Sequence, residues 1–422
     1  MAKRESRAAQ RQKQLDEALQ VAVPDRTDIV VVGGGAAGLV AAITAAEDDT
    51  QVVVLERDLS CGLPILATGN GRCNFANVQL DVRRFNCPEF VDAVCGPRWL
   101  DDVLEFFRYC GMRWCLEDDR LYPVSRQAAS VRNVLLARAQ EAGVVLAPAR
   151  EVVGLTYDGS AARVTYRTSS GEESQLEAGA VVVATGGGDA GWLEGLGLPL
   201  VPSSPVLCPL ACEPSPLSEL DGRRAHARVM LNREGSFFPS WQERGEVLFR
   251  SYGLSGIVIF DASRRAGKGD LLELDLAPDL NQSELRMLVD QFARGDFPEG
   301  CLDGVLDPAI ACVLERLARE RWHIDWPERK VPASDSEALM MLVKSLPAVV
   351  VGPTDIEHAQ VMRGGLATDS FDPATLAARE HPWLFACGEA LDVDADCGGY
   401  NLGWAWKSGM VAGKAAVERA HA

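Results

Sequence analysis

The sequence is poor in the residue patterns that bind metals. It has only five histidines in 422 residues, and none of them stands in an HExxH or HxH arrangement. Twelve cysteines are present, but no two have the CxxC spacing of zinc ribbons and dithiol redox motifs. We therefore expect no metal site, and we expect the cysteines to be reduced, mostly buried thiols of a cytosolic protein.

Positive charge is also scarce. The 42 Lys and Arg residues face 60 Asp and Glu residues, which gives a formal net charge of -18 and an isoelectric point near 4.8. A surface with this excess of negative charge repels phosphate backbones and anionic lipid headgroups. We predict a small-molecule partner, with no nucleic acid and no membrane, and the sequence specifies no oligomeric state.

No apolar run fits a membrane anchor or a signal peptide. Residues 29–46 contain no charge, but four glycines lie at the centre of this run. The basic start MAKRESR is not followed by a small-residue cleavage pattern. We therefore expect a soluble, cytoplasmic protein.

Two common catalytic patterns are missing as well. Residues 409–414 lack the spacing of a P-loop, and Gly253-Leu-Ser255-Gly256 is one residue short of GxSxG. Phosphoryl transfer and serine hydrolysis are therefore not expected.

The chain is long enough for two or three domains. Residues 1–24 are polar and charged and predict a flexible N-terminal arm, either a frayed helix or a disordered segment. Continuous runs of Val and Ile in residues 25–198 and 363–422 predict buried parallel strands, and the intervening periodic segments predict helices. A strand, a glycine turn, a helix and a second strand open the first stretch, an order that is typical of a Rossmann-like α/β domain.

Another type of pattern lies between these two stretches. Six prolines between residues 199 and 216 mark a domain crossing. Short segments such as ARVMLN, GEVLFR and GIVIFDAS predict a small antiparallel β-barrel from residues 199–280 and 346–362. Apolar residues three and four apart predict a helical subdomain over residues 281–345.

The strongest local motif is Gly33-Gly-Gly35-Ala36-Ala37-Gly38, which follows a predicted strand and opens a predicted helix. Gly33 permits a tight turn, Gly35 lets a pyrophosphate approach the backbone, and Gly38 lets helix and strand touch. Glu56 ends the next strand, where its carboxylate would accept hydrogen bonds from an adenosine ribose, and Arg57 follows it. The motif predicts dinucleotide binding.

A second GxGxxG pattern begins at Gly186 but lacks a following helix and a second strand with an acidic end. We interpret Thr185, Gly186 and Gly187 as backbone that approaches the same cofactor. Near the C-terminus, Cys387-Gly388-Glu389 follows a strand and Gly398-Gly399-Tyr400-Asn401 precedes a helix. Glycine-rich turns at both ends of the chain favour FAD, because it is an extended cofactor, and that helix N-terminus would stabilise reduced flavin.

Five segments carry a resemblance to a known family: ATGNGRCNFAN, ATGGG, GEVLFRSYGLSG, HAQVMRGG and GEALDVDADCGGYNLGWAWKSGMVAG. In this order they resemble the bacterial BaiN-like flavoproteins, also labelled aminoacetone-oxidase-type FAD-binding enzymes. The resemblance covers nearly the whole chain from Asp28 to Ala416. It implies an α/β fold in which residues 25–198 and 363–422 form one Rossmann-like FAD-binding domain. Residues 199–280 and 346–362 would form an inserted small β-barrel, and residues 281–345 a helical subdomain.

The resemblance also implies roles for particular residues. The motif residues at 33–38 together with Glu56 would hold the adenosine diphosphate. The flavin ring and ribityl chain would be held by a larger set: Gly69, Asn70, Gly71, Arg72, Cys73, Asn74, Gly388, Glu389, Gly399, Asn401 and Leu402.

This chain departs from the family pattern at three places. It has Leu63-Pro64 where the family usually has a basic pair, Met362-Arg363 where members usually have smaller residues, and Asp396-Cys397 ahead of Gly398. These departures bear on the substrate more than on FAD binding.

The resemblance suggests an FAD-dependent oxidoreductase in which NADH or NADPH serves as a transient reductant and a conjugated enone is reduced by hydride transfer from flavin N5. Candidate catalytic groups are Tyr400 and Tyr252 as proton donors and Arg72 as a group that polarises a carbonyl. Cys73 is expected to pack against its neighbours. Two alternatives stay open, namely an FAD-dependent oxidase of a small amine and a non-catalytic flavin-binding sensor.

Overall fold

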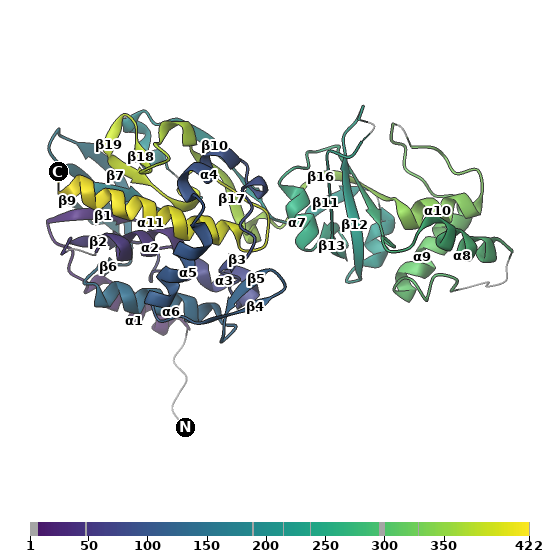
Figure 1. Ribbon diagram of the computed structural model, residues 1–422, viewed down its shortest axis with the longest axis horizontal. Coiled ribbons are helices and arrows are strands. Elements are labelled where there is room, and N and C mark those ends of the chain that lie inside the picture. The colour runs from purple at the N-terminus through teal and green to yellow at the C-terminus, as the bar shows by residue number, and fades with distance from the viewer. Residues whose placement is uncertain are drawn as a thin grey trace, which may run out of the picture. The chain divides into compact units, whose positions relative to one another are not determined.

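The protein is described by a computed structural model that covers residues 7–46, 49–187, 190–213, 215–236, 238–294, 300–327 and 329–421. The chain divides into two compact units, Met1–Ser204 with Val361–Ala422 and Pro205–Gln360 (Figure 1). This division puts the segments predicted as a barrel and as a helical subdomain into one unit. The chain crosses between the units at residues 204–205 and 360–361, where the sequence predicts crossings at 198–199 and 362–363.

A mixed sheet forms the centre of the first unit, with the strand order β18-β19-β9-β1-β2-β6 and with β7 and β8 continuing from β9. Strands β1, β2, β6, β9 and β19 pair in parallel. Their apolar runs are buried on both faces, as the sequence pattern predicts. The strands are β1 Arg26–Val32, β2 Val52–Leu55, β6 Val145–Ala147, β7 Arg150–Tyr157, β8 Ala162–Thr168, β9 Glu173–Val183, β18 Ala377–Ala378 and β19 His381–Ala386.

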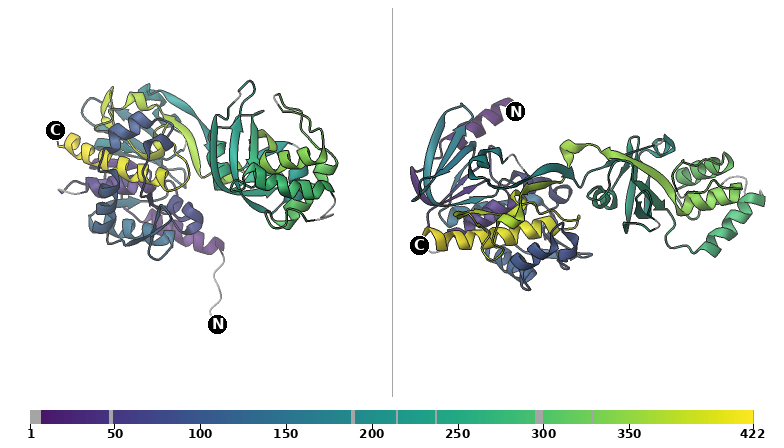
Figure 2. Two further views of the ribbon diagram at one scale, coloured as in Figure 1. Left: turned by 45° about the vertical axis from the view of Figure 1, so that its right-hand side comes forward. Right: turned by 90° about the horizontal axis from the view of Figure 1, so that it is seen from above.

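Two helices pack closely beside this sheet, α2 (Ala36–Ala45) and the C-terminal α11 (Tyr400–Ala420), which lie side by side in Figures 1 and 2. A Cβ on Gly409 would lie 2.6 Å from the carbonyl oxygen of Ala37, and one on Gly413 would lie 2.4 Å from that of Ala41. Any larger residue at these two positions of α11 would push the helices apart. The further helices are α3 Leu63–Ala67, α4 Pro88–Cys95, α5 Trp99–Tyr109 and α6 Ala128–Glu141.

Shorter elements complete the first unit. A small sheet has the order β3-β5-β4, with β3 Ala76–Asn77, β4 Trp114–Glu117 and β5 Arg120–Pro123. The 3₁₀ turns are η1 Thr68–Gly71, η2 Val82–Arg84, η3 Gly191–Leu196, η6 Thr368–Ser370 and η7 Gly388–Ala390.

The N-terminal segment, predicted as a frayed helix or a disordered arm, contains a helix in its described part. Residues Arg7–Leu19 form helix α1, and Ala18 is buried. The guanidinium of Arg150 donates hydrogen bonds to the carbonyls of Leu19 and Val21. These contacts satisfy carbonyls at the end of α1 and tie it to β7.

The second unit contains a closed antiparallel barrel with the order β11-β14-β13-β12-β15-β16. Its strands are β11 Leu210–Glu213, β12 Arg224–Asn232, β13 Trp241–Arg250, β14 Gly253–Ser255, β15 Leu271–Asp275 and β16 Leu346–Pro353. One apolar core joins the barrel to the helices, which explains why the two predicted subdomains form one unit. The helical elements are η4 Ser215–Leu220, α7 Ile257–Ser263, α8 Gln282–Arg294, α9 Pro308–Arg319, α10 Asp335–Lys344 and η5 Ile356–His358.

Two paired strands, β10 (Leu200–Val206) and β17 (Val361–Leu366), lie where the chain passes from one unit to the other and back. Strand β17 is therefore the first segment of the chain after it returns to the first unit.

Candidate functional site

The turn between β1 and α2 has the conformation that its sequence predicts. Gly33 has a φ of 101°, which favours glycine, and its N–H donates to the carbonyl of Leu55. A Cβ on Gly38 would lie 1.9 Å from the carbonyl oxygen of Gly33, so the helix and the strand touch at this point. The turn is therefore closed on the side that faces the sheet.

The same turn is open at Gly35. A Cβ built on this residue would meet no atom within 4 Å, and no side chain caps the N-terminus of α2. Ala36 and Ala37 form the first turn of α2, where backbone N–H groups and the helix dipole favour an anion. This open cradle fits the pyrophosphate of a dinucleotide.

Glu56 lies beside this cradle and is buried. One carboxylate oxygen accepts the N–H of Gly34 at 2.7 Å and the other accepts the N–H of Asp58 at 2.8 Å. These bonds fix the carboxylate at the end of β2, where its remaining lone pairs suit a ribose hydroxyl. The neighbouring Arg57 is exposed.

The loop after β9 approaches the first turn closely. A Cβ on Gly33 would lie 2.4 Å from the carbonyl oxygen of Ala184 and 3.2 Å from the Cα of Thr185. Gly186 has a φ of 65°, and a Cβ on Gly187 would collide with the side chain of Met362. Thr185, Gly186 and Gly187 therefore bring backbone next to the cradle and next to β17. The middle of the second GxGxxG pattern, at residues 188 and 189, lies outside the described residues.

The Thr68–Asn74 segment has an unusual backbone. Gly69, Asn70, Gly71 and Cys73 all have φ between 53° and 81°. Non-glycine residues rarely adopt this region, and such conformations cluster at ligand sites. Asn74 is half-buried and touches Gly69, since a Cβ on Gly69 would lie 3.1 Å from its backbone nitrogen.

Cys73 is fully buried, and burial raises the pKa of its thiol to about 11. Such a thiol stays protonated near neutral pH, which supports the predicted packing role.

Arg72 is held in a fixed position at the end of this segment. Its guanidinium forms an ion pair with Glu117 and lies 4.5 Å from the centre of the Tyr122 ring. Arg126 also pairs with Glu117, and the bonds from Arg126 and then Arg72 hold the pKa of that carboxyl below its usual range. The guanidinium groups of Arg72 and Arg126 thus share one carboxylate, so this group of three side chains carries a net charge of one positive unit.

The C-terminal turn lies against the first turn. Gly388 has a φ of 63°, and a Cβ on it would lie 2.7 Å from the Cβ of Ala37. Its N–H donates to Ser408 Oγ, and its carbonyl accepts from the indole of Trp404. The turn is thereby fixed to α11, and two segments about 350 residues apart in the sequence meet at the N-terminus of α2.

Glu389 follows in this turn and is half-buried. Desolvation and, to a smaller extent, repulsion by Asp394 raise the pKa of its carboxyl to about 7, against the opposing effect of a hydrogen bond from the N–H of Met362.

The residues that open α11 pack in different ways. Gly399 caps the helix and lies against the backbone of Ala76, since a Cβ on it would approach Ala76 C to 2.7 Å. The side-chain oxygen of Asn401 accepts the N–H of Ala395, and its amide donates to the carbonyl of the same residue. Asn401 therefore shapes the preceding loop, and Leu402 packs against the core.

Tyr400 is buried, with 7% of its surface exposed, and its ring packs edge-on against Phe85. The guanidinium of Arg84 lies 6.0 Å from the ring centre.

Tyr252 belongs to the second unit, in the turn between β13 and β14, while Tyr400 and Arg72 belong to the first. The structure therefore brings Tyr400 and the glycine-rich turns into one unit and leaves Tyr252 in the other. Tyr252 is half-buried, and the guanidinium of Arg250 lies 5.9 Å from the centre of its ring.

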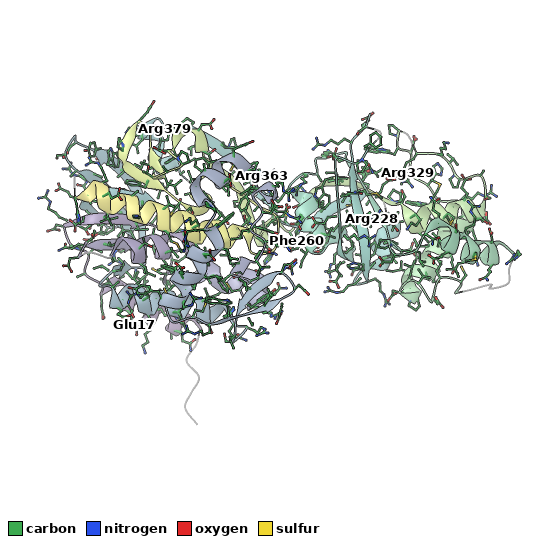
Figure 3. The ribbon with its side chains drawn as sticks, viewed as in Figure 1. Glu17, Arg228, Phe260, Arg329, Arg363 and Arg379 are labelled. Carbon is green, nitrogen blue, oxygen red and sulfur yellow. The ribbon has the colours of Figure 1, made fainter. Side chains whose placement is uncertain are left out.

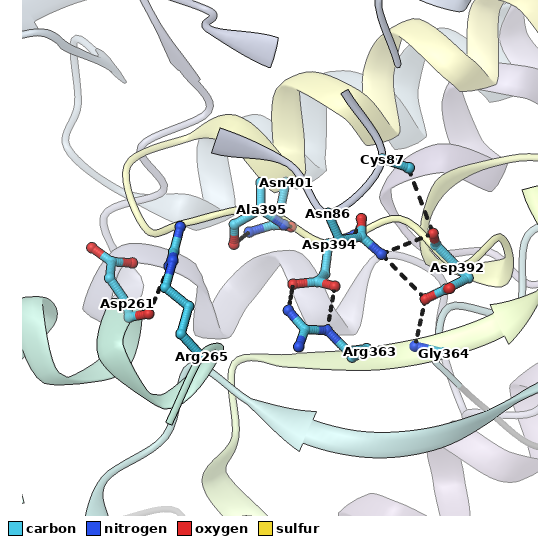
Figure 4. A network of polar contacts seen from close by, with 10 residues as sticks. All are labelled: Asn86, Cys87, Asp261, Arg265, Arg363, Gly364, Asp392, Asp394, Ala395 and Asn401. Carbon is cyan, nitrogen blue, oxygen red and sulfur yellow. Dashed lines mark hydrogen bonds and ion pairs between the residues drawn. The ribbon is translucent and has the colours of Figure 1, made fainter. Parts of the chain in front are cut away.

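One cluster was absent from the predicted site residues. Asp394 is fully buried and accepts two hydrogen bonds from Arg363, at 2.8 and 2.9 Å, while Asn86 and Gly364 bind Asp392 (Figure 4). Two sequence features could have indicated this cluster: the alternating aspartates of DVDAD, and Arg363, one of the departures from the family pattern. The partners come from three distant segments, so the sequence could not pair them.

Two absences are observed within the described residues. No group of three or more His, Cys, Asp or Glu side chains is arranged to hold a metal ion. No described helix combines the length and the apolar character that crossing a bilayer requires.

The fold and the cradle define a class, the Rossmann-type dinucleotide-binding proteins with an inserted second unit. Within this class, the family described as HI0933-like protein Rossmann domain matches residues 27–415, and the chain belongs to that family. Membership places the protein among the FAD-dependent oxidoreductases, which confirms the predicted class of enzyme and its α/β fold.

Three proteins illustrate the similarity. The chain is 31% identical over 396 residues to the 3-dehydro-bile acid delta(4,6)-reductase of Clostridium scindens, covering 87% of this chain and 93% of that protein, which confirms the resemblance to the BaiN-like flavoproteins. It is 24% identical over 380 residues to the ribosomal RNA dihydrouridine synthase of Escherichia coli, covering 85% and 90%. In fold it is similar to the open conformation of a flavocytochrome c3 fumarate reductase, with a TM-score of 0.50, 14% identity, and coverage of 97% and 81%.

Proposed function

We propose that the protein uses NADH or NADPH to reduce a carbon–carbon double bond that is conjugated with a carbonyl group in a small molecule. The observation that carries this proposal is the chemistry that two relatives have in common. One is named for reducing double bonds of a 3-dehydro bile acid, and the other for making dihydrouridine. The ring double bond of uridine that is reduced to give dihydrouridine is conjugated with a ring carbonyl. Both names therefore describe the same type of reaction on different scaffolds.

The residues of the first unit fit the cofactor that such a reaction needs. Bound FAD would supply hydride transfer at its N5 atom. The N–H groups at the start of α2 would bind the pyrophosphate, and Glu56 would bind the adenosine ribose. Segment 69–74 and the turn at Gly388 and Glu389 would hold the ribityl chain and the ring. The positive φ angles of Gly69, Asn70, Gly71 and Cys73 support this role, because such backbone conformations cluster at ligand sites.

Polar groups near this segment would orient the substrate and move the proton. Arg72 would polarise the substrate carbonyl, because contacts with Glu117 and Tyr122 hold its guanidinium in place. Arg72 and Arg126 together neutralise one carboxylate, so the group keeps a net positive charge. Tyr400 and Tyr252 would be proton donors to the carbon next to the carbonyl. Of these two, Tyr400 lies in the same unit as the cradle.

Anaerobic rapid mixing tests the proposal. The full-length protein is loaded with FAD and mixed with NADH or NADPH, and the visible flavin absorption is followed. We expect fast bleaching by one nicotinamide, followed by recovery of the absorption when a steroid enone is added. A saturated ketone of the same scaffold is the matched control, and it should not restore the absorption.

Other outcomes would replace the proposal. Bleaching only by a small amine, with reoxidation by oxygen, would indicate an amine oxidase. Flavin that no donor bleaches would indicate a flavin-binding sensor. Recovery with uridine-containing RNA, but with no enone, would indicate a substrate like that named for the second relative; the net charge of -18 argues against this outcome.

A further inference from the structure

The loop that follows β2 packs against Gly34 in the turn between β1 and α2. The N–H of Gly62 donates to the carbonyl of Gly34 at 2.7 Å, and the carboxylate of Glu56 accepts the N–H of Gly34 at 2.7 Å. A Cβ on Gly34 would lie 2.6 Å from the Sγ of Cys61. Both polar backbone groups of Gly34 are therefore bonded at this loop, directly before the open position at Gly35.

The side chain of Arg132 holds the end of this loop. Arg132 belongs to α6, 71 residues after Cys61 in the chain, and is half-buried. Its Nε donates to the carbonyl of Cys61 at 2.8 Å, and its Nη2 donates to Ser60 Oγ. A Cβ on Gly62 would lie 2.9 Å from the Cγ of Arg132, so the aliphatic part of the side chain covers Gly62. One arginine thus contacts three successive residues of the loop.

The start of the loop is held in a different way. The N–H of Arg150 donates to the carbonyl of Glu56, and the N–H of Ala149 donates to that of Asp58, both at 2.8 Å. These are backbone contacts, which do not depend on the identity of a side chain. The hydrogen bonds at the end of the loop come from one guanidinium group, so a single substitution removes them.

Gly62 also connects the loop to the segment that would hold the flavin ring. It has a φ of 74°, stands at the N-cap of α3 and accepts the N–H of Ile65 at 3.2 Å. Helix α3 ends at Ala67, and the turn that begins at Thr68 follows directly. A loop that moved away from Arg132 would therefore lose its hydrogen bond to Gly34 and would displace the start of α3.

We propose that Arg132 is a positioning residue for FAD, which keeps residues 60–62 against Gly34 and so holds the turn of residues 33–38 in the geometry that binds the pyrophosphate. The inference rests on the proposed placement of FAD at this turn. A turn that is fixed before binding loses little conformational entropy when the cofactor binds, so the contacts of Arg132 lower the Kd of FAD.

The test measures the Kd of FAD for the full-length apo-protein by the quenching of flavin fluorescence, and the Kd of ADP by competition with FAD. Arg132→Met keeps an aliphatic side chain over Gly62 but loses the hydrogen-bond donors. We expect it to raise the Kd of FAD roughly tenfold and that of ADP by the same factor, because ADP carries the diphosphate that the turn binds. Arg132→Lys keeps the charge and can reach one acceptor, so its Kd should lie between those of wild type and Arg132→Met.

A purely structural role of Arg132 would give another pattern. Urea unfolding of the apo-proteins measures their stability, and a loss of stability by itself leaves the Kd unchanged while the apo-protein stays folded. An Arg132→Met variant that is less stable but binds FAD like wild type would overturn the proposal. So would a variant that binds FAD more weakly but ADP like wild type, since Arg132 would then act away from the pyrophosphate.

Two other arginines of the same unit are controls. Arg138 is half-buried on the same helix, where its guanidinium pairs with Glu141 and lies 3.9 Å from the centre of the Tyr109 ring. Arg379 is exposed (Figure 3). Arg138→Met and Arg379→Met should each change the Kd of FAD less than about twofold. A control effect as large as that of Arg132→Met would show a general effect of lost positive charge and would contradict the proposal.

Ser60→Ala decides the question if Arg132→Met does not fold. It removes the acceptor of the Nη2 hydrogen bond at a half-buried loop position. The proposal requires the Kd values of FAD and ADP to rise together, by about two- to threefold, and unchanged values would overturn it. A wild-type protein that binds neither FAD nor ADP would instead overturn the placement of the cofactor, and this inference with it.

Discussion

The turn of residues 33–38 and the loop of residues 388–399 meet at the N-terminus of α2 but are stabilised by different means. The first turn depends on backbone hydrogen bonds and close glycine contacts, and its one carboxylate, Glu56, binds backbone N–H groups. The second loop contains buried aspartates that need Arg363, Asn86 and Arg84 from elsewhere in the chain. One cofactor cradle therefore combines a turn formed by residues close in sequence with a loop that long-range contacts hold in place.

Two alanine substitutions in the first turn should have the largest effects and should differ in kind. Gly38→Ala puts a methyl group 1.9 Å from the carbonyl oxygen of Gly33, so the apo-protein should lose about 3 kcal/mol of unfolding free energy or more. Gly35→Ala meets no atom within 4 Å and suits the φ of -77° at this residue, so stability should stay the same or rise by about 0.4–1 kcal/mol. Its Kd for FAD should nevertheless rise roughly tenfold or more, because the methyl group occupies the cradle.

Urea unfolding of the apo-proteins and FAD titration measure these two effects separately. Each variant adds one methyl group and serves as the control for the other. A Gly35→Ala variant that binds FAD like wild type would show that the pyrophosphate does not bind at this turn.

Glu389→Gln probes the charge of the second loop and should have an intermediate effect. The pKa of Glu389 is raised from 4.5 to about 7 in the folded protein. The carboxyl therefore contributes its full stability below about pH 4.5, and this contribution is lost as the pH rises through about 7. At about pH 8 the Gln variant should be more stable than wild type by on the order of 1–3 kcal/mol, and the difference should shrink toward about pH 5.

Thermal unfolding of the apo-proteins across this pH range gives the difference directly. Glu380→Gln, which changes an exposed carboxylate of the same unit, is the control and should show no such trend. A stability difference that is independent of pH would mean that Glu389 is not the titrating group.

Asn401→Ala tests the shape of the second loop and should have the smallest effect. The amide of Asn401 binds both the N–H and the carbonyl of Ala395, so its loss should cost about 1–2 kcal/mol and should make bound flavin more fluorescent. Asn401→Asp keeps the acceptor for Ala395 N–H, but it loses the donor and adds a carboxylate beside the buried Asp396, so it should be at least as unstable as the Ala variant. An Ala variant that is as stable as wild type would show that the Asn401 amide does not hold this loop.

Short apolar segments show where the sequence pattern is ambiguous. GIVIFDAS was predicted as a strand of the barrel, but Ile257–Ser263 form helix α7. This prediction is wrong because a short apolar run has no distinct period, and burial of Val258 and Ile259 in the barrel core selects the helix. By contrast, the long runs of Val in β1 and β9 permit no other interpretation, because they are flanked by glycine and polar turns.

The positions of two candidate catalytic residues could not be predicted from the sequence. Arg72 is placed by Glu117, which lies 45 residues further along the chain, and that pairing has no pattern in the sequence. Tyr252 was grouped with Tyr400, but it folds into the other unit. Neither fact follows from residue types or local spacing.

The unit of β1, α2 and β2, with its glycine turn and its acidic strand end, could be predicted from the order of the residues alone. Its residues are neighbours or lie within one strand–helix–strand unit, as Gly34 and Glu56 do. How β9 and β19 join that sheet and how the second loop is held follow from tertiary packing. Strand β9 pairs with β1 far along the chain, and Asp394 meets Asn86 across about 300 positions and pairs with Arg363 on β17. A buried charge is stable only beside its partner, and which partner arrives depends on how distant segments pack.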